Sequence, residues 1–327
     1  MPIDQQFASP GEPPVLLVRP AGPDDLRAAS RIYAVNEMAM RRRMHPLTRL
    51  AEADEAEQSA DALADLQTLH VEDPRQVLVA EVAGEIVGVA AAAFREHHAH
   101  IQYLFVAPNA QTRGTGRDLL GRLHDAARTA GCSLVTLQAS DDPRALTRYF
   151  RLGLLPQPPN VVWRADDPLF PEPSFANPLE ATPLHIDDNA ALNTVGDIDK
   201  AVRGVRRRQD IERWLQEGAS GSLLVDRITG KPAGYFLVAL GGGEGSIGPV
   251  AAMDEEEFGN VFSIALSTAK SLQDPGTSRK VASPGENYAA IDPLLSAHFQ
   301  PAYVMPFFAS GPIGRFDRYI FHDLDLL

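Results

Sequence analysis

Apolar residues recur with two different periods along the first half of the chain. A spacing of three to four positions predicts helices, and it is found in residues 22–36, 47–70, 114–130 and 143–152. Short alternating or continuous apolar runs bounded by turn residues predict strands, in residues 15–19, 76–82, 85–94, 99–106 and 134–139. The resulting order, β-α-α-β-β-β-α-β-α, indicates a mixed α/β (α+β) sheet rather than a regular βαβ array.

A proline-rich stretch divides the chain. Residues 156–183 contain eight prolines, which disfavour a helix and predict a linker or a wrapping connection. Further helices are expected near residues 188–202, 208–216, 255–270 and 288–297, and further strands at 222–226, 233–240, 246–251 and 280–282. Because 327 residues exceed the usual size of a single core, we expect a flexible tail (1–14), a first domain (15–156), a linker (157–183) and a second domain (184–327).

Composition excludes several classes of protein. A net charge of -13 argues against a nucleic-acid or an anionic membrane partner. The single cysteine, Cys132, cannot form an intrachain disulfide, and no metal-ligand spacing is present. No apolar run is long enough to span a membrane, and residues 1–14 lack the apolar core of a signal peptide. We therefore expect a cytoplasmic protein without a metal.

The segment 104–120 has the form of a phosphate-binding loop. A strand ends there, a loop with two glycines follows, and a helix begins. The first N–H groups of a helix have no intrahelical acceptor and lie at the positive end of its dipole, so they bind phosphate groups. Glycine lets a pyrophosphate approach the backbone. A plain helix start is the structural alternative. The P-loop spacing and the dinucleotide-binding spacing are both absent.

Two spaced motifs resemble the GNAT superfamily of N-acetyltransferases. The first is Val106-x-Pro108 followed by Gln111-x-x-Gly114-x-Gly116, which is similar to the family's signature for the pyrophosphate of acyl-CoA. The second is Asp142-x-x-Ala145-x-x-x-Tyr149-x-x-x-Gly153-Leu154, which resembles the last helix of that fold. The resemblance extends over the first half of the chain, where the order of elements also agrees.

This resemblance implies a binding mode for acetyl-CoA. In the family the pantetheine arm pairs like an extra strand with the strand before the loop, and the pyrophosphate lies on the loop. Carried over, the cofactor-binding residues are Phe105, Val106, Gln111, Thr112, Arg113, Gly114, Thr115, Gly116 and Arg117. The family's general acid corresponds to Tyr149, whose phenol could protonate the leaving thiolate; a core residue on an amphipathic helix is the alternative.

The general base is less clear from the sequence. Many relatives have an acid in the strand before the loop, but the matching position is Gln102, which is not basic. Strand alternation places His98 and His100 on the same face as Gln102, and histidine titrates near neutral pH. His100 is therefore a candidate base. The alternatives are a solvated hairpin end for these histidines, and an amine that arrives neutral or loses its proton through water.

The second half resembles a degraded copy of the first. Asn287-x-x-Ala290-x-x-x-Leu294-x-x-x-His298-Phe299 repeats the spacing of the motif around Tyr149, and Ile247–Val250 ends a strand as Leu104–Val106 does. Leu294 replaces the tyrosine. Glu255, Glu256, Glu257 and Phe258 replace the loop residues 111–114, and three carboxylates repel a pyrophosphate. These features predict two GNAT-like domains in tandem, the first intact and the second degenerate.

A basic run, Arg206-Arg207-Arg208, stands out in the acidic second half. It could bind an acidic group of the acceptor, although a solvated charged face is the commoner explanation. Asp197 and Asp199 lie close enough in sequence to pair with it.

Taken together, these residues predict an N-acyltransferase that passes an acetyl group from acetyl-CoA directly to an amine in a ternary complex. The acceptor is a small-molecule or peptide amine, and the chain is a monomer or a homodimer. The alternative is a non-catalytic protein that binds acyl-CoA as a sensor or scaffold.

Overall fold

The computed structural model describes residues 15–44, 54–111, 114–172, 178–239, 244–272 and 277–324. The chain folds into two compact units, each built from several segments. Unit 1 comprises residues 1–39, 53–91 and 103–125, and unit 2 comprises residues 40–52, 92–102 and 126–327. The long strands β3 (Glu85–Arg95) and β4 (His98–Val106) and the helix α3 (Thr115–Thr129) each contribute to both units.

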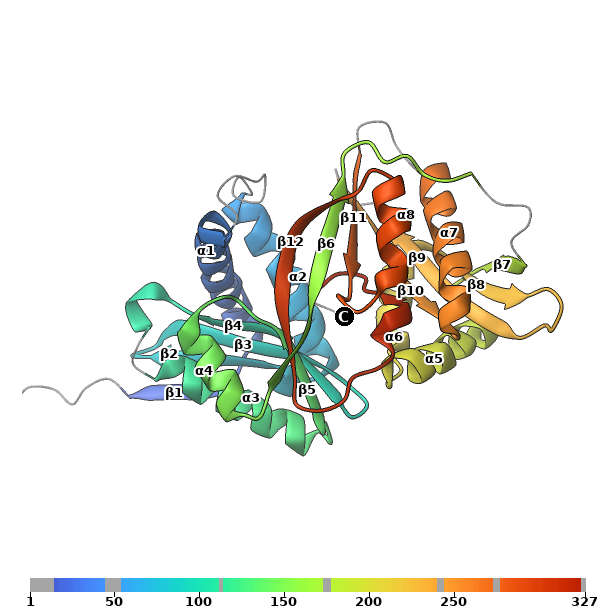
Figure 1. Ribbon diagram of the computed structural model, residues 1–327. Coiled ribbons are helices and arrows are strands. Elements are labelled where there is room, and N and C mark those ends of the chain that lie inside the picture. Colours follow the sequence, from blue (N-terminus) through green and yellow to red (C-terminus); the bar gives the residue numbers. More distant parts are fainter. Residues whose placement is uncertain are drawn as a thin grey trace, which may run out of the picture. The chain divides into compact units, whose positions relative to one another are not determined.

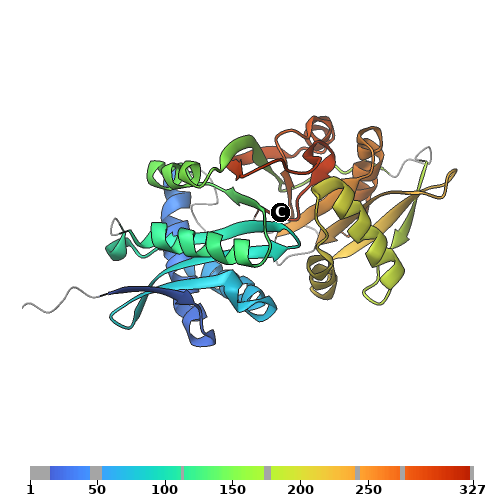
Figure 2. The same ribbon diagram turned by 90° about the horizontal axis from the view of Figure 1, so that it is seen from below.

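Unit 1 is a small antiparallel sheet with helices, as the alternation of its sequence predicts. Its strands β1 (Leu16–Pro20), β2 (Val77–Val82) and the start of β3 pair in that order. Its helices are most of α1 (Leu26–Met44), α2 (Glu55–Glu72) and the start of α3. Asp54 caps α2 by accepting a hydrogen bond from the N–H of Ala56 at 2.9 Å. Figure 2 shows α3 lying along the strands of this unit.

The close packing of α3 needs a glycine in the strand beneath it. A Cβ atom at Gly88 would lie 2.9 Å from Cδ1 of Leu119 and 3.2 Å from the carbonyl oxygen of Phe105. These separations are too short for a side chain, so Gly88 lets the start of α3 approach the sheet. The position of the glycine-containing loop therefore depends on a residue that precedes it by more than twenty positions.

Unit 2 contains one mixed sheet with the strand order β4-β5-β12-β6-β11-β10-β9-β8-β7 (Figure 1). Strand β13 (Tyr319–Ile320) pairs with β10. The other strands are β5 (Leu134–Gln138), β6 (Leu155–Ala165), β7 (Leu179–Pro183), β8 (Ser220–Asp226), β9 (Pro232–Ala239), β10 (Glu244–Ala252), β11 (Ser278–Ser283) and β12 (Gln300–Ala309). The β4–β5 and β10–β11 pairs are parallel and the remaining pairs are antiparallel.

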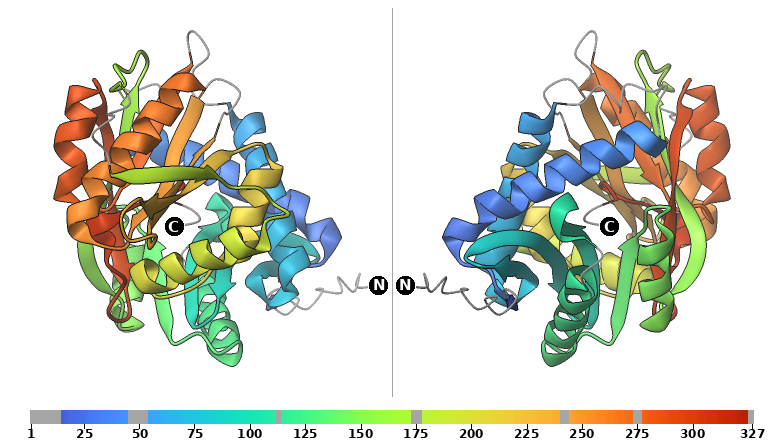
Figure 3. Two further views of the ribbon diagram at one scale, coloured as in Figure 1. Left: turned by 90° about the vertical axis from the view of Figure 1, so that its right-hand side faces the viewer. Right: turned by 90° about the vertical axis from the view of Figure 1, so that its left-hand side faces the viewer.

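Helices cover both faces of the sheet in unit 2 (Figure 3). Helices α7 (Glu255–Ser271) and α8 (Ile291–Ser296) contribute Phe258, Phe262 and Leu294 to one apolar core. Helices α5 (Asn189–Arg203) and α6 (Arg208–Gln216) contribute Leu192 and Trp214 to the other. Helix α4 (Pro143–Arg151) follows β5. Short 3-10 turns occur at Pro23–Asp25, Pro74–Gln76, Pro108–Ala110, Tyr288–Ala290 and Phe316–Arg318. None of the described helices is both long and apolar enough to cross a membrane.

The two halves of the chain exchange a strand in unit 2. Strand β6 follows α4 in the first half, yet it pairs with β11 of the second half. Strand β12 follows α8 in the second half, yet it pairs with β5 of the first, with Phe307 opposite Gln138. The two exchanged strands also pair with each other (Figure 1). Each half therefore completes the sheet of the other.

Most of the expected elements are found within a few residues of their predicted bounds, but one strand lies where we expected a linker. Residues 155–165 form β6 although Pro156, Pro158 and Pro159 lack backbone donors. The pairing with β12 is irregular there, because Gln157 pairs with Phe307 and Asn160 pairs with Met305. Strand β6 therefore has one residue more than β12 between these two pairs, which makes a bulge. Prolines are tolerated at such a bulge because no ladder hydrogen bond is required of them. The predicted domain boundaries themselves stay a prediction.

Candidate functional site

The predicted phosphate loop lies between β4 and α3 in unit 1. The carbonyl oxygen of Gly114 accepts from the N–H groups of Arg117 at 2.9 Å and Asp118 at 3.1 Å, so α3 begins at this glycine. Gly114 has a φ of +92°, a conformation that favours glycine. The N–H groups of Thr115 and Gly116 follow at the positive end of the helix. Thr112 and Arg113 lie outside the described residues.

Gln111 ties this loop to the end of β4. Its Nε2 atom donates to the carbonyl oxygen of Val106 at 3.1 Å and to Oδ1 of Asn36 on α1 at 3.3 Å. Asn36 in turn donates from Nδ2 to the carbonyl oxygen of Ile32 at 2.7 Å. Gln111 thus positions the loop with its side chain. Asn36 was not among the predicted site residues, although a polar residue on the apolar face of a predicted helix was a signal for it.

The other loop residues divide into buried and exposed ones. Thr115 is buried, and its hydroxyl lies 3.4 Å from the carbonyl oxygen of Ala110. Gly116 is also buried. Arg117 is exposed, and its Nε atom donates to Oδ1 of Asp118 at 2.9 Å. The described part of the loop therefore offers backbone donors and one exposed guanidinium group.

Strand β4 has an open edge beside this loop. Its pairing with β5 ends at Ile101↔Leu137 within the described residues, whereas β4 continues to Val106. The N–H of Ala107 donates to the carbonyl oxygen of Val87 on β3 at 2.8 Å. Because backbone groups alternate along a strand, those of Phe105 also point to β3, and those of Leu104 and Val106 point away from it. The geometry favours Val106 over Phe105 as a backbone partner for a ligand and adds Leu104.

The side chain of Phe105 has a packing role. Its ring lies 5.0 Å from that of Tyr33 on α1, at an interplanar angle of 83°. Tyr33 makes the same kind of edge contact with Tyr103, whose hydroxyl donates to Oδ2 of Asp65 on α2 at 3.1 Å. These aromatic contacts hold the end of β4 against the two helices.

Tyr149 lies on α4 in unit 2. Asp142 caps this helix by accepting from the N–H of Arg144 at 2.8 Å, and the neighbouring Arg144 guanidinium lowers the pKa of Asp142. Tyr149 itself is 6% exposed. Burial raises the pKa of its phenol to about 12, so the hydroxyl is protonated at neutral pH. Its hydroxyl donates to no described residue.

The candidate base His100 is enclosed by a hydrogen-bond chain. His98 Nε2 lies 2.7 Å and His100 Nδ1 lies 2.8 Å from Oγ1 of Thr136, and His100 Nε2 lies 3.2 Å from the carbonyl oxygen of Leu324. A carbonyl only accepts, so Nε2 of His100 carries its proton and Nδ1 accepts from Thr136. His98 then donates from Nε2 to the same hydroxyl.

This chain removes the free lone pair that a base needs. Both histidines are buried. Burial, with the nearby Arg203 charge, lowers the pKa of His100 to about 3 and that of His98 well below its usual value. The geometry therefore disfavours His100 as the general base and gives it a structural role. Gln102 lies one residue past the last β4–β5 pair, and both atoms of its amide are buried without a partner among the described residues.

The motif around Tyr149 recurs in the second half with the same geometry. After α4, the N–H of Leu154 donates to the carbonyl oxygen of Tyr149 at 3.0 Å, and Gly153 has a φ of +76°. After α8, the N–H of Phe299 donates to Leu294 at 2.9 Å, and His298 has a φ of +64°. Both helices thus end in the same left-handed cap, with Leu294 in the position of Tyr149.

The loop of the first half has no equivalent in the second. Eight residues, 107–114, separate β4 from α3, whereas only Met253 and Asp254 separate β10 from α7. Glu255, Glu256 and Glu257 form the first turn of α7, and Phe258 is fully buried. The first turn of α7 therefore has the wrong charge and too short a loop for a phosphate site.

These observations agree with three comparisons. The model of the acetyltransferase (GNAT) family matches residues 38–154. An acetyltransferase of Sodalis glossinidius is 34% identical over 90 residues, and one of Photorhabdus laumondii is 33% identical over 82 residues. Residues 38–154 are thus similar to the acetyltransferase (GNAT) family. These matches cover 28% and 25% of this chain, and the chain spans 63% and 57% of the length of the two relatives.

Solved GNAT structures resemble the whole chain. A GCN5-related N-acetyltransferase from Sphaerobacter thermophilus matches with a TM-score of 0.61 at 15% identity, over 95% of this chain and 98% of that one. A tandem GNAT protein from the clavulanic acid biosynthesis pathway matches with a TM-score of 0.56 at 16% identity, over 91% and 99%. The chain therefore has a mixed α/β fold with two GNAT-like domains in tandem.

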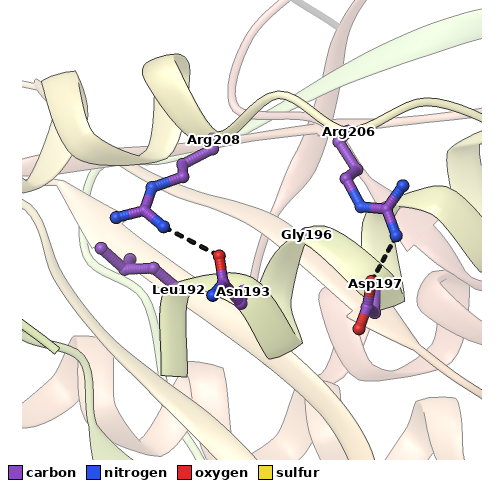
Figure 4. A pocket seen from close by; sticks show the side chains of 6 residues that line it. All are labelled: Leu192, Asn193, Gly196, Asp197, Arg206 and Arg208. Atoms are coloured by element: carbon purple, nitrogen blue, oxygen red, sulfur yellow. Dashed lines mark hydrogen bonds and ion pairs between the residues drawn. The ribbon is translucent and has the colours of Figure 1, made fainter. Parts of the chain in front are cut away.

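A cavity lies between α5 and the start of α6 in unit 2. It has a volume of about 230 Å³ and is lined by Leu192, Asn193, Gly196, Asp197, Arg206 and Arg208 (Figure 4). Arg206 pairs with Asp197 at 2.5 Å and Arg208 with Glu212 at 2.6 Å. Arg207 is fully buried and pairs with Asp199 at 3.0 Å. The predicted pairing of the basic run with both aspartates is confirmed, and these ion pairs leave the cavity without free positive charge.

The described residues contain no group of three or more histidine, cysteine, aspartate or glutamate side chains that could hold a metal ion. Cys132 is buried, and its thiol lies 3.8 Å from the carbonyl oxygen of Glu96.

Proposed function

We propose that this chain is an N-acetyltransferase that passes the acetyl group of acetyl-CoA directly to an amine. The observation that carries the proposal is the bond from Gln111 to the carbonyl oxygen of Val106. It joins the loop before α3 to the open edge of β4. The helix N-terminus and the strand edge suit the two ends of one ligand. An anion fits the helix N-terminus, and an amide-bearing arm fits an unpaired strand edge.

The described residues fit acyl-CoA by several tests. Gly114 has a conformation that a larger residue would strain, and a Cβ atom there would lie 3.3 Å from Nη2 of Arg117. The N–H groups of Thr115 and Gly116 would bind the pyrophosphate, with Arg117 adding charge. Thr112 and Arg113 are proposed as further contacts on the resemblance alone. Leu104 and Val106 would pair with the pantetheine arm.

The chemistry then needs few groups from the protein. Bound acetyl-CoA would supply a thioester whose acetyl carbon an amine can attack. The N–H of Val106 would stabilise the oxygen that gains negative charge. Tyr149 would donate its proton toward the sulfur atom. Since its pKa of about 12 exceeds that of an ordinary thiol, near 8.5, its main contribution would be a hydrogen bond to the developing thiolate.

Proton removal from the amine would not use His100. Its Nδ1 atom already accepts from Thr136, and its pKa is about 3. Gln102 cannot take a proton, so we propose that it binds the acceptor and that the amine arrives neutral or loses its proton to water. An amine is partly neutral at a pH near the pKa of its ammonium form. We therefore expect the rate of acetyl transfer to rise with pH.

A non-catalytic acyl-CoA sensor is the second candidate function. The absence of an ionisable group at Gln102 favours it. Incubating the protein with acetyl-CoA and a panel of amines while measuring free thiol separates the two. Thiol release that depends on the amine supports the enzyme. Calorimetry that detects one acetyl-CoA site per chain, together with no release for any amine, supports the sensor, and two equivalent sites contradict both.

A further inference from the structure

Three buried carboxamides on β4, β5 and β6 have no hydrogen-bond partner. Gln102, Gln138 and Asn160 each have both amide atoms enclosed, and neither atom bonds to a described residue. Asn160 is 1% exposed. Buried polar side chains in folded proteins nearly always have partners, because an unmade hydrogen bond costs free energy. Three such groups in one sheet therefore indicate a missing partner.

Strand pairing places these amides on one face of the sheet. Gln138 is opposite Phe307 on β12, and Asn160 is opposite Met305. Directly opposed residues share a face, and Phe307 and Met305 belong to the same apolar core. Gln102 is one residue past Ile101↔Leu137, next to Gln138, where the pairing of β4 with β5 ends.

Two buried arginines of unit 2 have carboxylate partners. Arg207 pairs with Asp199 at 3.0 Å, and Arg95 pairs with Asp210 at 2.6 Å. His98 and His100 are occupied by Thr136 and Leu324. The three amides without a described partner are themselves uncharged, and each offers N–H donors and a carbonyl acceptor.

The chemistry of the amides selects the kind of ligand. Each carboxamide has two donor hydrogens and an oxygen that accepts. A carboxylate only accepts, so it would leave the three amide oxygens unpaired. An ammonium group only donates, so it would leave the amide hydrogens unpaired. Hydroxyl and carboxamide groups both donate and accept, so a ligand that carries them can satisfy such a row.

We propose that Gln102, Gln138 and Asn160 bind the non-reacting part of the acceptor, and that this part is uncharged and carries hydroxyl or carboxamide groups. The proposal rests on the proposed acetyl transfer. Phe307 and Met305, which the second half of the chain supplies through β12, lie beside these amides. The second half thus contributes to acceptor binding although its own loop cannot bind acetyl-CoA.

Two matched pairs of amines test the class of acceptor. Glucosamine is compared with glucosamine 6-phosphate, and glycinamide with glycine, using kcat/KM from thiol release calculated per concentration of neutral amine, because the two members of a pair differ in the pKa of the ammonium group. We expect the uncharged member of at least one pair to be favoured about tenfold or more, and the favoured pair distinguishes hydroxyl from carboxamide recognition. A preference for the charged member in either pair, or no preference in both, overturns the proposal.

Two variants test the residues independently of catalysis. Gln138→Met and Asn160→Leu replace an unpaired amide by an apolar group of similar size. Removing a polar group that lacks a partner is neutral or stabilising, so the melting temperature should stay equal or rise. The KM for the favoured amine should rise about tenfold or more, with the KM for acetyl-CoA unchanged. Gln300→Met, which changes an exposed carboxamide on β12, is the matched control and should alter neither quantity.

The outcomes separate this inference from the proposed function. Calorimetry with the favoured amine and CoA measures binding without acetyl transfer. If the wild type binds the amine and the two variants do not, the amide site holds even where no thiol is released. If the variants melt several degrees lower and bind the amine normally, structural water satisfies these amides and the inference is wrong.

Discussion

The two halves of this protein differ most where a strand leads into the next helix. Between β4 and α3 there are eight residues, and one of them is a glycine with positive φ. Between β10 and α7, two residues lead directly into three glutamates. The helix caps that follow, after α4 and α8, remain alike. A duplicated fold can therefore keep its backbone geometry after the chemistry of a loop has been lost, because different residues determine the two.

The largest expected effect is on folding, when the two halves of the chain are produced separately. A fragment of residues 1–172 would lack β12, so β5 and β6 would each lose a neighbouring strand. We expect this fragment to be aggregated or unfolded by circular dichroism, since exposed apolar strand edges aggregate. Co-expression with residues 173–327 should restore a folded complex. Cooperative unfolding of the 1–172 fragment alone would show that the exchanged strands are dispensable.

The next largest effect concerns the loop. Gly114→Glu places a carboxylate and a strained residue at the proposed pyrophosphate site, so acetyl-CoA should bind about 10³-fold more weakly, a change of about 4 kcal/mol. The melting temperature without ligand should change little. Gly121→Glu, on the same helix at a site open to solvent, is the control. Calorimetry showing normal affinity for Gly114→Glu in a folded protein would refute the site.

A smaller effect, on turnover, is expected from replacing Tyr149. Tyr149→Phe keeps the ring and its contact with Phe308 at 6.0 Å but removes the donor. Turnover should fall about 10²-fold with unchanged affinity for acetyl-CoA. The matched change in the second half, Leu294→Tyr, should create no activity, because the loop before α7 cannot bind the donor. Unchanged turnover in Tyr149→Phe would indicate a core residue.

The smallest effect is a dependence of stability on pH. The folded pKa of His100, about 3, lies below the usual value near 6.5. Between these values the unfolded chain binds a proton that the folded chain does not, so acidification lowers stability, by about 2 kcal/mol at pH 5. His100→Gln should reduce the slope of unfolding free energy against pH from 6.5 to 4 in denaturant titrations. His97→Gln, at an exposed position, is the control, and an equal slope in wild type and His100→Gln would contradict the assignment.

Much of the fold could be predicted from local patterns. The spacing of apolar residues predicted the bounds of β2, β3, β4, α3 and α4 to within about two residues. This spacing reflects which face of a single element is buried, so it can be read locally. The motif spacing also identified the GNAT resemblance and the tandem arrangement. The helix caps at Gly153 and His298 follow from the same local spacing.

Other features escaped prediction because they depend on partners far away in sequence. His100 was a plausible base on its own strand, but Thr136 and Leu324 enclose it. The prolines of residues 156–159 indicated a linker, but a bulge against β12 accommodates them in a strand. Gln138 and Asn160 carried no sequence signal, since an amide is unusual only when its surroundings leave it unpaired.

The sequence by itself determined the short-range geometry of this protein: which segments are helices, where the glycines open the loop before α3, and which copy of the loop became acidic. These properties depend on residues a few positions apart. Only the tertiary structure decided that β6 and β12 exchange places, that β4 keeps an open edge beyond Ile101, and that three amides share one face. Strand pairing joins residues more than a hundred positions apart, and many registers satisfy the same apolar pattern, so packing of the whole sheet selects among them.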